Sequence, residues 1–400
     1  MCLSLFFNKF VTMNCYRYIV SLLALAASSV SCVYDFQPDY QGQAGYVAIE
    51  GDILIGEECA FSAFFSTGLN DENNRDSSLI CSFRVEASDG TVFPCQGDVV
   101  DLTNADPALE YRLVVDVSSP FSATYESTWA PVETTPSIDD LSWSIEDDGS
   151  RLWVNVSTHS ERETGYYRWT ASETWEYYAT YYADHFFAFS GTAYKGKSID
   201  SDAIIEYEEG DNTFFCWKSD ELSDILIGST ADLTEDRLVN YGIYSFLPED
   251  RKVSHVYFVE LTQRRLTGEA YRFWENLLHN STNVGGLFSP EPLELRGNIA
   301  NVDDPDELVL GFVSVATLSR AKLFINNYDT RFSRWSGPSY GDTIVSPRDY
   351  RKFYDWQYRV GWFEITGERS GWVWLPKECV DCRTSGGTKD RPSWWINNDK

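Results

Sequence analysis

The sequence predicts a mainly β protein made of two β-rich regions and one amphipathic helix. Short alternating apolar segments, separated by turn residues, recur between residues 46 and 129 and again after residue 140. Aromatic residues make up 16% of the chain and methionine occurs only twice, a composition that suits strands. At 400 residues the chain is longer than one hydrophobic core usually supports, so we expect two folded domains.

Residues 1–31 predict a lipoprotein signal peptide. They hold Lys9 and Arg17, no acidic residue and an apolar run over residues 18–27, and small residues precede Cys32. Cys32 is therefore the expected lipid attachment site, whose acyl chains would anchor the protein to a lipid bilayer. An ordinary cleavage site with Cys32 as a plain thiol is the alternative, and Met13 is a second candidate start.

Residues 32–42 are expected to form a polar tether between the lipid and the fold. No apolar run after Cys32 approaches the roughly 20 residues that a membrane-spanning helix needs. The chain carries 32 basic and 61 acidic residues, a net charge of −29. Because phosphate recognition needs a basic surface, we expect no nucleic-acid partner.

We place the first domain at residues 43–133, where a series of short apolar segments predicts strands. Asp89-Gly90 separates two of these segments and predicts a hairpin with a type I′ turn, which needs positive φ at both central residues. Six or seven short strands in a region of about 90 residues are typical of an immunoglobulin-like or transthyretin-like β-sandwich. The predicted strands are 46–50, 60–66, 79–87, 91–95, 111–117 and 123–129.

The second and larger domain, residues 134–400, begins after a proline-rich linker. Alternating apolar residues over 141–145 and 152–156, separated by Asp148-Gly149, predict another hairpin. Residues 233–240 read as a short helix or a turn.

The stretch 166–189 is crowded with aromatic residues. Trp169, Trp175 and Tyr178 are the candidates for stacking on a bound ligand. The alternative interpretation is a strand pair whose rings fill a core on one face and shield the sheet on the other.

One amphipathic helix is expected between Thr267 and Asn280. Thr267 suits the N-cap, and Glu269 is favourably placed in the first turn. An apolar stripe at spacings of three and four predicts one buried face, in which we expect Trp274 to lie in the core. The stripe consists of Ala270, Phe273, Trp274 and Leu277.

Six cysteines remain after Cys32, and in an exported chain disulfides are the default expectation. They are Cys59, Cys81, Cys95, Cys216, Cys379 and Cys382. The first domain holds three of them, so they cannot all pair within it. Cys379 and Cys382 have the spacing of a zinc half-site or a redox motif, but we favour a structural disulfide because other zinc ligands at suitable spacing and a helix after the motif are missing. The sequence leaves the connectivity open.

The sequence carries no recognised catalytic motif. A nucleophile elbow, a phosphate-binding loop and a histidine pair at metal spacing are all missing. We therefore predict no catalytic residue, no metal site and no cofactor. Paired carboxylates for glycoside hydrolysis stay open among the 61 acidic residues, because their separation depends on the fold.

Residues 214–240, 256–316 and 379–395, taken in order, resemble an uncharacterised Bacteroidota lipoprotein family, domain of unknown function 4249. The resemblance runs from Cys32 almost to the last residue and supplies no catalytic residues. It implies an outer-membrane lipoprotein with an immunoglobulin-like N-terminal domain and a larger β-rich domain. It also implies association with TonB-dependent uptake systems.

The leading hypothesis is a lipid-anchored outer-membrane accessory or binding protein at the cell surface, with a TonB-dependent transporter as partner. A surface hydrolase acting on glycans is the first alternative, suggested by the aromatic stretch and the many carboxylates. A structural or adhesive lipoprotein is the second.

Overall fold

The computed structural model describes residues 46–65, 79–183, 185–191, 193–201, 203–208, 213–282, 295–330, 358–365, 369–375 and 377–395. The chain divides into two compact units, Met1–Gly45 and Tyr46–Lys400. The predicted signal peptide, Cys32 and the tether lie outside the described residues. The described part of the second unit is mainly β, as predicted. Among the described residues, no helix combines the length and the apolar character needed to cross a membrane.

Two sheets share the first hydrophobic core. The smaller sheet has the order β23-β1-β4, and the larger has the order β22-β9-β8-β5-β6-β7-β3 with β10 paired to β8. Alternation along β8 (Glu110–Ser119) places Tyr111, Leu113, Val115 and Val117 in this core. The other strands are β1 (Val47–Glu50), β3 (Glu58–Ala60), β4 (Ser62–Phe65), β5 (Ile80–Ala87), β6 (Val92–Gln96), β7 (Val99–Asp101), β9 (Ala123–Ser127) and β10 (Ala130–Pro131).

A segment far along the chain completes these sheets. Residues 295–316, here called the return segment, contain β22 (Ile299–Asn301), β23 (Val309–Leu310) and β24 (Val315–Ala316). β22 pairs with β9 in antiparallel fashion, whereas β23 pairs with β1, and β24 with β2 (Ile53–Leu54), in parallel. The first set of sheets is therefore built from two separate stretches of sequence. The boundary between residues 133 and 134 stays a prediction.

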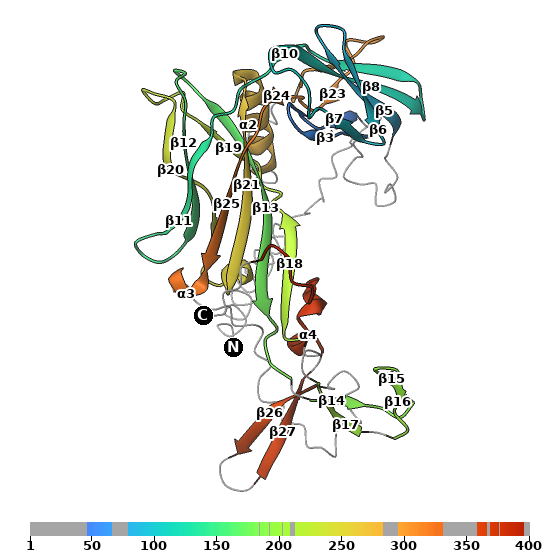
Figure 1. Ribbon diagram of the computed structural model, residues 1–400, viewed down its shortest axis with the longest axis vertical. Helices are drawn as coiled ribbons and strands as arrows, with labels where there is room; N and C mark the ends of the chain where they lie inside the picture. Colours follow the sequence, from blue (N-terminus) through green and yellow to red (C-terminus); the bar gives the residue numbers. More distant parts are fainter. Residues whose placement is uncertain are drawn as a thin grey trace, which may run out of the picture. The chain divides into compact units, whose positions relative to one another are not determined.

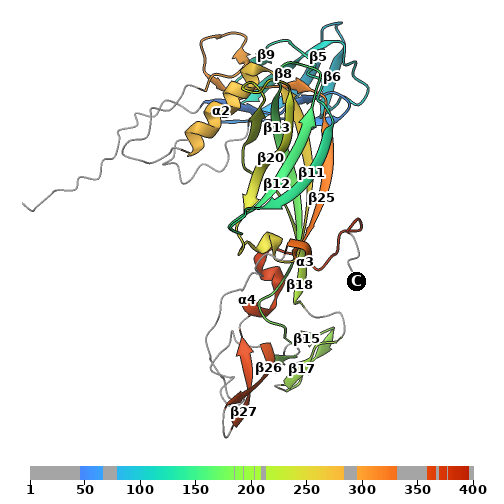
Figure 2. The same cartoon turned by 90° about the vertical axis from the view of Figure 1, so that its left-hand side faces the viewer.

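A second pair of sheets (Figure 1) forms the second core. One sheet has the order β18-β13-β21-β25 with β19 paired to β13, and the other has the order β11-β12-β20. Figure 2 shows their strands running alongside each other. The bounds are β11 (Ile138–Ile145), β12 (Leu152–His159), β13 (Tyr166–Tyr178), β18 (Phe215–Glu221), β19 (Leu226–Ser229), β20 (Arg237–Phe246), β21 (Val256–Leu266) and β25 (Ser319–Asn326).

Helix α2 (Gly268–Thr282) contacts β13, β19 and β21. The predicted cap is confirmed, because the backbone N–H of Ala270 donates to Thr267 Oγ1 at 3.2 Å. Ala270 and Phe273 are buried. Trp274 is only half-buried, so its predicted place in the core is wrong. Its ring lies 3.5 Å from the guanidinium carbon of Arg168, which covers one face.

The Asp89-Gly90 hairpin is confirmed, but its turn differs from the predicted type. Ala87 N donates to Thr91 O and Gly90 N donates to Ala87 O, which encloses a three-residue loop. Gly90 has φ +90°, whereas Asp89 is not among the described residues with positive φ. A type I′ turn needs positive φ at both positions. The loop instead matches a three-residue hairpin with glycine in the left-handed region.

Residues 237–240 differ from the predicted short helix or turn, because they begin strand β20 and pair with β12. Smaller sheets and short helices complete the described chain. The sheets contain β14 (His185–Ala188), β15 (Ala193–Tyr194), β16 (Lys197–Ser198), β17 (Ala203–Glu206), β26 (Tyr358–Ile365) and β27 (Arg369–Leu375). The short helices are η1 (Arg251–Val253), α3 (Asn327–Thr330), α4 (Lys377–Val380) and η3 (Cys382–Ser385).

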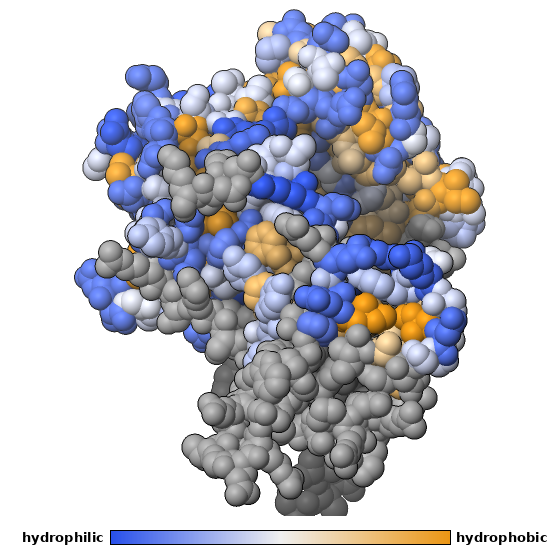
Figure 3. Space-filling model, turned by 60° about the horizontal axis from the view of Figure 1, so that its bottom comes forward, coloured by the Kyte–Doolittle hydropathy of each residue, from blue (hydrophilic) through white to orange (hydrophobic). Residues whose placement is uncertain are grey.

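Hydrophilic residues cover most of the described surface on the face shown in Figure 3, and hydrophobic residues gather there in small groups. Scattered apolar residues are usual on a protein surface.

Candidate functional site

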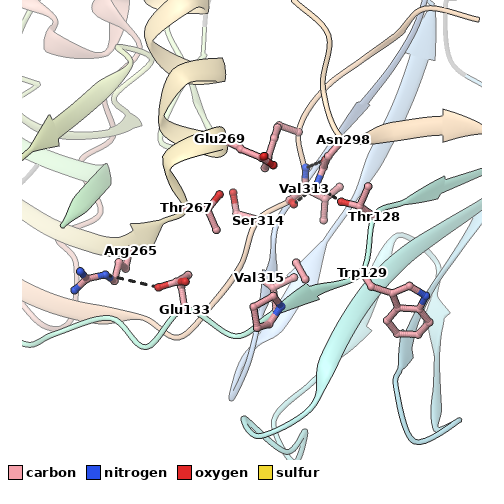
Figure 4. Close-up of a pocket in the computed structure, with 13 residues that line it drawn as sticks. Thr128, Trp129, Glu133, Arg265, Thr267, Glu269, Asn298, Val313, Ser314 and Val315 are labelled. Carbon is pink, nitrogen blue, oxygen red and sulfur yellow. Dashed lines mark hydrogen bonds and ion pairs between the residues drawn. The ribbon is translucent and has the colours of Figure 1, made fainter. Parts of the chain in front are cut away.

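A cavity of about 260 Å³ lies where the stretch after β9, the start of α2 and the return segment meet (Figure 4). Its volume is slightly below the roughly 300–1,000 Å³ typical of small-molecule sites. Hydroxyl, amide and carboxylate side chains share the lining with apolar ones. The lining residues are Thr128, Trp129, Ala130, Pro131, Glu133, Arg265, Thr267, Glu269, Asn298, Phe312, Val313, Ser314 and Val315.

The first turn of α2 supplies Thr267 and Glu269. Thr267 follows β21 directly and caps the helix, which fixes its side chain at the cavity wall. Glu269 follows two residues later, is exposed and lines the cavity. Figure 4 shows its carboxylate facing the same space as the hydroxyls of Thr267 and Ser314.

Ser314 is the most unusual polar residue of the lining. It is 6% exposed, and its Oγ has no hydrogen-bond partner among the described residues. Buried hydroxyl groups are normally hydrogen-bonded, and an unsatisfied one costs about 1–3 kcal/mol. The backbone N–H of Ser314 donates to Asp52 Oδ1 at 3.1 Å. This hydrogen bond holds the backbone of Ser314 against the chain between β1 and β2.

Asp52 is itself buried between two arginines, Arg168 on β13 and Arg264 on β21. Its Oδ2 accepts a hydrogen bond from Arg264 and lies 3.2 Å from Arg168 Nη1. Burial, with the neighbouring charge of Arg264, lowers the pKa of Arg168 to about 10 despite Asp52. This cluster joins β13 and β21 to the segment that carries Ser314.

Arg265 is the cationic residue of the lining, and its charge is already compensated. It is buried, with Nη1 3.0 Å from Asp236 Oδ2 and Nε 3.7 Å from Glu133 Oε2. Glu133 also pairs with Arg162 at 2.7 Å. Burial alone would raise the pKa of Asp236, but hydrogen bonds from Ser160, Tyr167 and Thr230 and the charge of Arg265 together lower it.

Asn298 and two glycines shape the part of the return segment that lines the cavity. Asn298 Nδ2 donates to Val313 O at 2.9 Å, and Val313 N donates back to Asn298 Oδ1 at 2.8 Å. A Cβ at Gly297 would lie 1.5 Å from the Gly311 carbonyl oxygen, and Gly311 itself has φ +122°. Only glycine therefore permits this close approach of the two backbone stretches.

The predicted ligand-stacking residues lie on β13, away from the cavity lining. Trp169 and Trp175 are 1% and 5% exposed and belong to the second core, so the prediction that their rings stack on a ligand is wrong. Tyr178 is 36% exposed at the strand's end, and its hydroxyl lies 2.9 Å from His255 Nε2. Ligand stacking on Tyr178 stays a prediction.

A disulfide between two of the candidate cysteines is confirmed, but it joins Cys382 to Cys216 and not to Cys379 of the same motif. Their Cα atoms are 5.7 Å apart although 166 residues separate them in sequence. Cys379 is buried and is not part of this bond. The remaining candidate cysteines, Cys59, Cys81 and Cys95, are thiols in this structure, and burial raises the pKa of Cys59 to about 11.

Sequence reasoning missed the cavity, because its lining comes from three distant segments. In the sequence, Thr267 and Glu269 indicate only the start of a helix. The residues around Ser314 form no pattern that indicates a binding site. Among the described residues, no group of three or more His, Cys, Asp or Glu could hold a metal ion. The side chains that line the cavity can donate and accept hydrogen bonds and can compensate a positive charge.

A protein-family model described as "Domain of unknown function (DUF4249)" matches residues 68–322, which is more than half of the chain. The matched range contains all of the residues that line the cavity. No curated protein matches this sequence.

Proposed function

The chain belongs to the family described as "Domain of unknown function (DUF4249)", and from this premise we propose that it is a lipid-anchored binding protein of the outer membrane. Cys32 is the proposed attachment site. A small polar ligand, or the end of a larger one, occupies the cavity between α2 and the return segment. We propose binding without catalysis.

One observation carries the proposal of ligand binding. Ser314 Oγ is buried against the cavity without a partner among the described residues, and the carboxylate of Glu269 faces the same space. A ligand that hydrogen-bonds to Ser314 would offset the cost of that unsatisfied group. The apolar wall formed by Phe312, Val313 and Pro131 would contact the rest of the ligand.

We also propose that the N-terminal sheets form an immunoglobulin-like or transthyretin-like sandwich, with β22 and β23 added by the return segment. Two sheets that contribute to one core support this proposal. The cavity would then lie where this sandwich, the return segment and the start of α2 meet.

The proposed partner is a TonB-dependent transporter, and the proposed location is the cell surface. The resemblance of the sequence to an outer-membrane lipoprotein family and the small residues before Cys32 support both. Copurification in mild detergent after crosslinking tests the partner. A stoichiometric outer-membrane barrel is the expected result, and recovery of the protein alone contradicts the proposal.

Two further measurements test location and catalysis. Protease added to intact cells should cleave the protein if it faces outwards, and protection would favour a periplasmic orientation. Incubation of the purified protein with surface glycans should release no reducing sugar. Release that disappears on substitution of two specific carboxylates would instead favour a hydrolase.

A further inference from the structure

We propose that the cavity binds a primary ammonium group, presented either by a small amine or by the amino terminus of a peptide. The inference rests on the proposed ligand-binding function and names the ligand chemistry of that same site. Glu269 compensates the charge, and Ser314 and Thr267 accept hydrogen bonds from the ammonium group.

The charges at the cavity favour a cationic ligand. Glu133 and Glu269 both line it, and Arg265 is the cation among the lining residues. Arg265 already faces Asp236 and Glu133. No ion pair of Glu269 is seen within the described residues, so this carboxylate can pair with a positive charge on a ligand. An anionic ligand would face both carboxylates.

The first turn of α2 is less suited to an anion than a helix start usually is. The N–H of Ala270 donates to Thr267 Oγ1, and the N–H of Tyr271 donates to Thr267 O at 2.9 Å. The negative charge of Glu269 also lies in this turn. The bond from Tyr271 is the first regular bond of the helix, and Thr267 Oγ1 compensates one of the donors that a helix start otherwise leaves unpaired. The charge of Glu269 compensates part of the local positive potential.

The hydroxyl groups and the carboxylate match the hydrogen-bonding capacity of an ammonium group. An ammonium group has three N–H donors and no acceptor, so it requires three acceptors. Glu269 supplies a carboxylate oxygen, Ser314 an oxygen without a partner and Thr267 the second lone pair of its hydroxyl. Figure 4 shows these three side chains facing one space.

The size and the remaining lining limit what carries the ammonium group. A cavity of about 260 Å³ accepts a short chain rather than a large ring system. Phe312, Val313 and Pro131 give it an apolar side. A short alkyl amine or the first residue of a peptide fits this combination.

Isothermal titration of the lipidated full-length protein in detergent tests the inference with two matched pairs of probes. The first pair is n-pentylamine and n-pentanol, and the second is triglycine amide and its N-acetylated form. The ammonium member of at least one pair should bind at least about tenfold more tightly than its neutral analogue. Tighter binding of pentylamine identifies a small amine as the source, and tighter binding of triglycine amide identifies a peptide terminus.

Three variants assign the binding to the cavity. Glu269→Gln should weaken ammonium binding by about tenfold or more, and Ser314→Ala by about threefold to tenfold. Glu275→Gln is the matched control, since Glu275 is exposed on the same helix but does not line the cavity. It should leave the affinity within about twofold of wild type.

Equal binding of charged and neutral probes, no binding of any probe, or equal losses in Glu269→Gln and Glu275→Gln would overturn the inference. Crosslinking to the transporter is measured on the same variants. If Glu269→Gln keeps the transporter but no probe binds wild type, the ammonium inference fails while the proposed partner stands. Loss of the transporter from wild-type samples counts against the proposed function itself.

Discussion

Asp52→Asn tests whether one buried carboxylate holds the two β regions together. Asp52 belongs to the first core region, whereas Arg168 and Arg264 belong to β13 and β21. The side chain of Asp52 is 7% exposed, and those of the arginines are 18% and 9% exposed. Asparagine keeps the volume and an oxygen for the N–H of Ser314. It removes the negative charge that compensates two buried guanidinium groups.

The expected cost is about 3–5 kcal/mol of the free energy of unfolding, the usual loss when one partner of a buried ion pair is removed. Urea denaturation followed by tryptophan fluorescence measures it, with the free energy taken by linear extrapolation. Asp139→Asn is the control. Asp139 lies 2.6 Å from His159 with 41% of its side chain exposed, so the loss should stay below about 1 kcal/mol.

A loss below about 1 kcal/mol in Asp52→Asn, or one equal to that of the control, would refute the reasoning. A double variant sharpens the test. Arg168→Gln added to Asp52→Asn removes one of the two uncompensated charges, so the combined loss should be smaller than the sum of the single losses. Additive losses would mean that Asp52 and Arg168 do not interact.

Four other predictions follow, three from the structure and one from the sequence. Cys382→Ser removes a disulfide that joins residues 166 positions apart, so the free energy of unfolding, measured in thermal melts, should fall by up to about 5 kcal/mol. Trp274→Ala should cost about 2 kcal/mol, less than a fully buried aromatic residue, and a loss above about 4 kcal/mol would mean that the ring is core. The pKa of Asp236 in the folded protein is lowered from the usual 3.8, so its ionised carboxylate stabilises the fold above pH 3.8 and this effect is lost as the pH falls through the folded-state pKa. The difference in the free energy of unfolding between wild type and Asp236→Asn should therefore shrink in acid. Cys32→Ala should be absent from the outer-membrane fraction, and fatty-acid labelling that persists in this variant would contradict the lipid site.

Strands with a strong local pattern could be predicted from the sequence. The hairpin of β11 and β12 was found from alternating apolar residues on both sides of Asp148-Gly149. The start of α2 was found from its cap and its apolar stripe. In each case the residues that decide the structure lie within one or two turns or strands of each other, so the signal is local.

The return segment could not be predicted in the same way. β23 and β24 are each two residues long, and their parallel partners in β1 and β2 lie more than 250 positions earlier in the chain. Such short strands carry no measurable alternation. Their pairing depends on a fold that the rest of the chain must form first, and the cavity behind Ser314 depends on it too.

Successive side chains of β13 point to opposite faces of the sheet, which explains why two of the predicted stacking residues are buried and the third is exposed. Trp169 and Trp175 have odd numbers and point into the second core with Tyr167 and Tyr177. Tyr178 has an even number and lies on the other face, near His255. The sequence could have separated the two sets if the strand had been recognised as continuous over Tyr166–Tyr178.

Stability and ligand binding should be linked through Asp52. The same carboxylate accepts a hydrogen bond from the backbone of Ser314 and compensates the charges of Arg168 and Arg264. A ligand that binds only the folded state at a hundredfold excess over its Kd stabilises that state by about 2.7 kcal/mol. Asp52→Asn keeps the oxygen that accepts from Ser314 but removes the charge that ties this segment to Arg168 and Arg264, so it should weaken ligand binding as well as folding. Ligand-dependent shifts of the urea midpoint measure both effects in one titration. If the ligand stabilised Asp52→Asn as much as wild type, Asp52 would hold the sheets together without positioning the cavity.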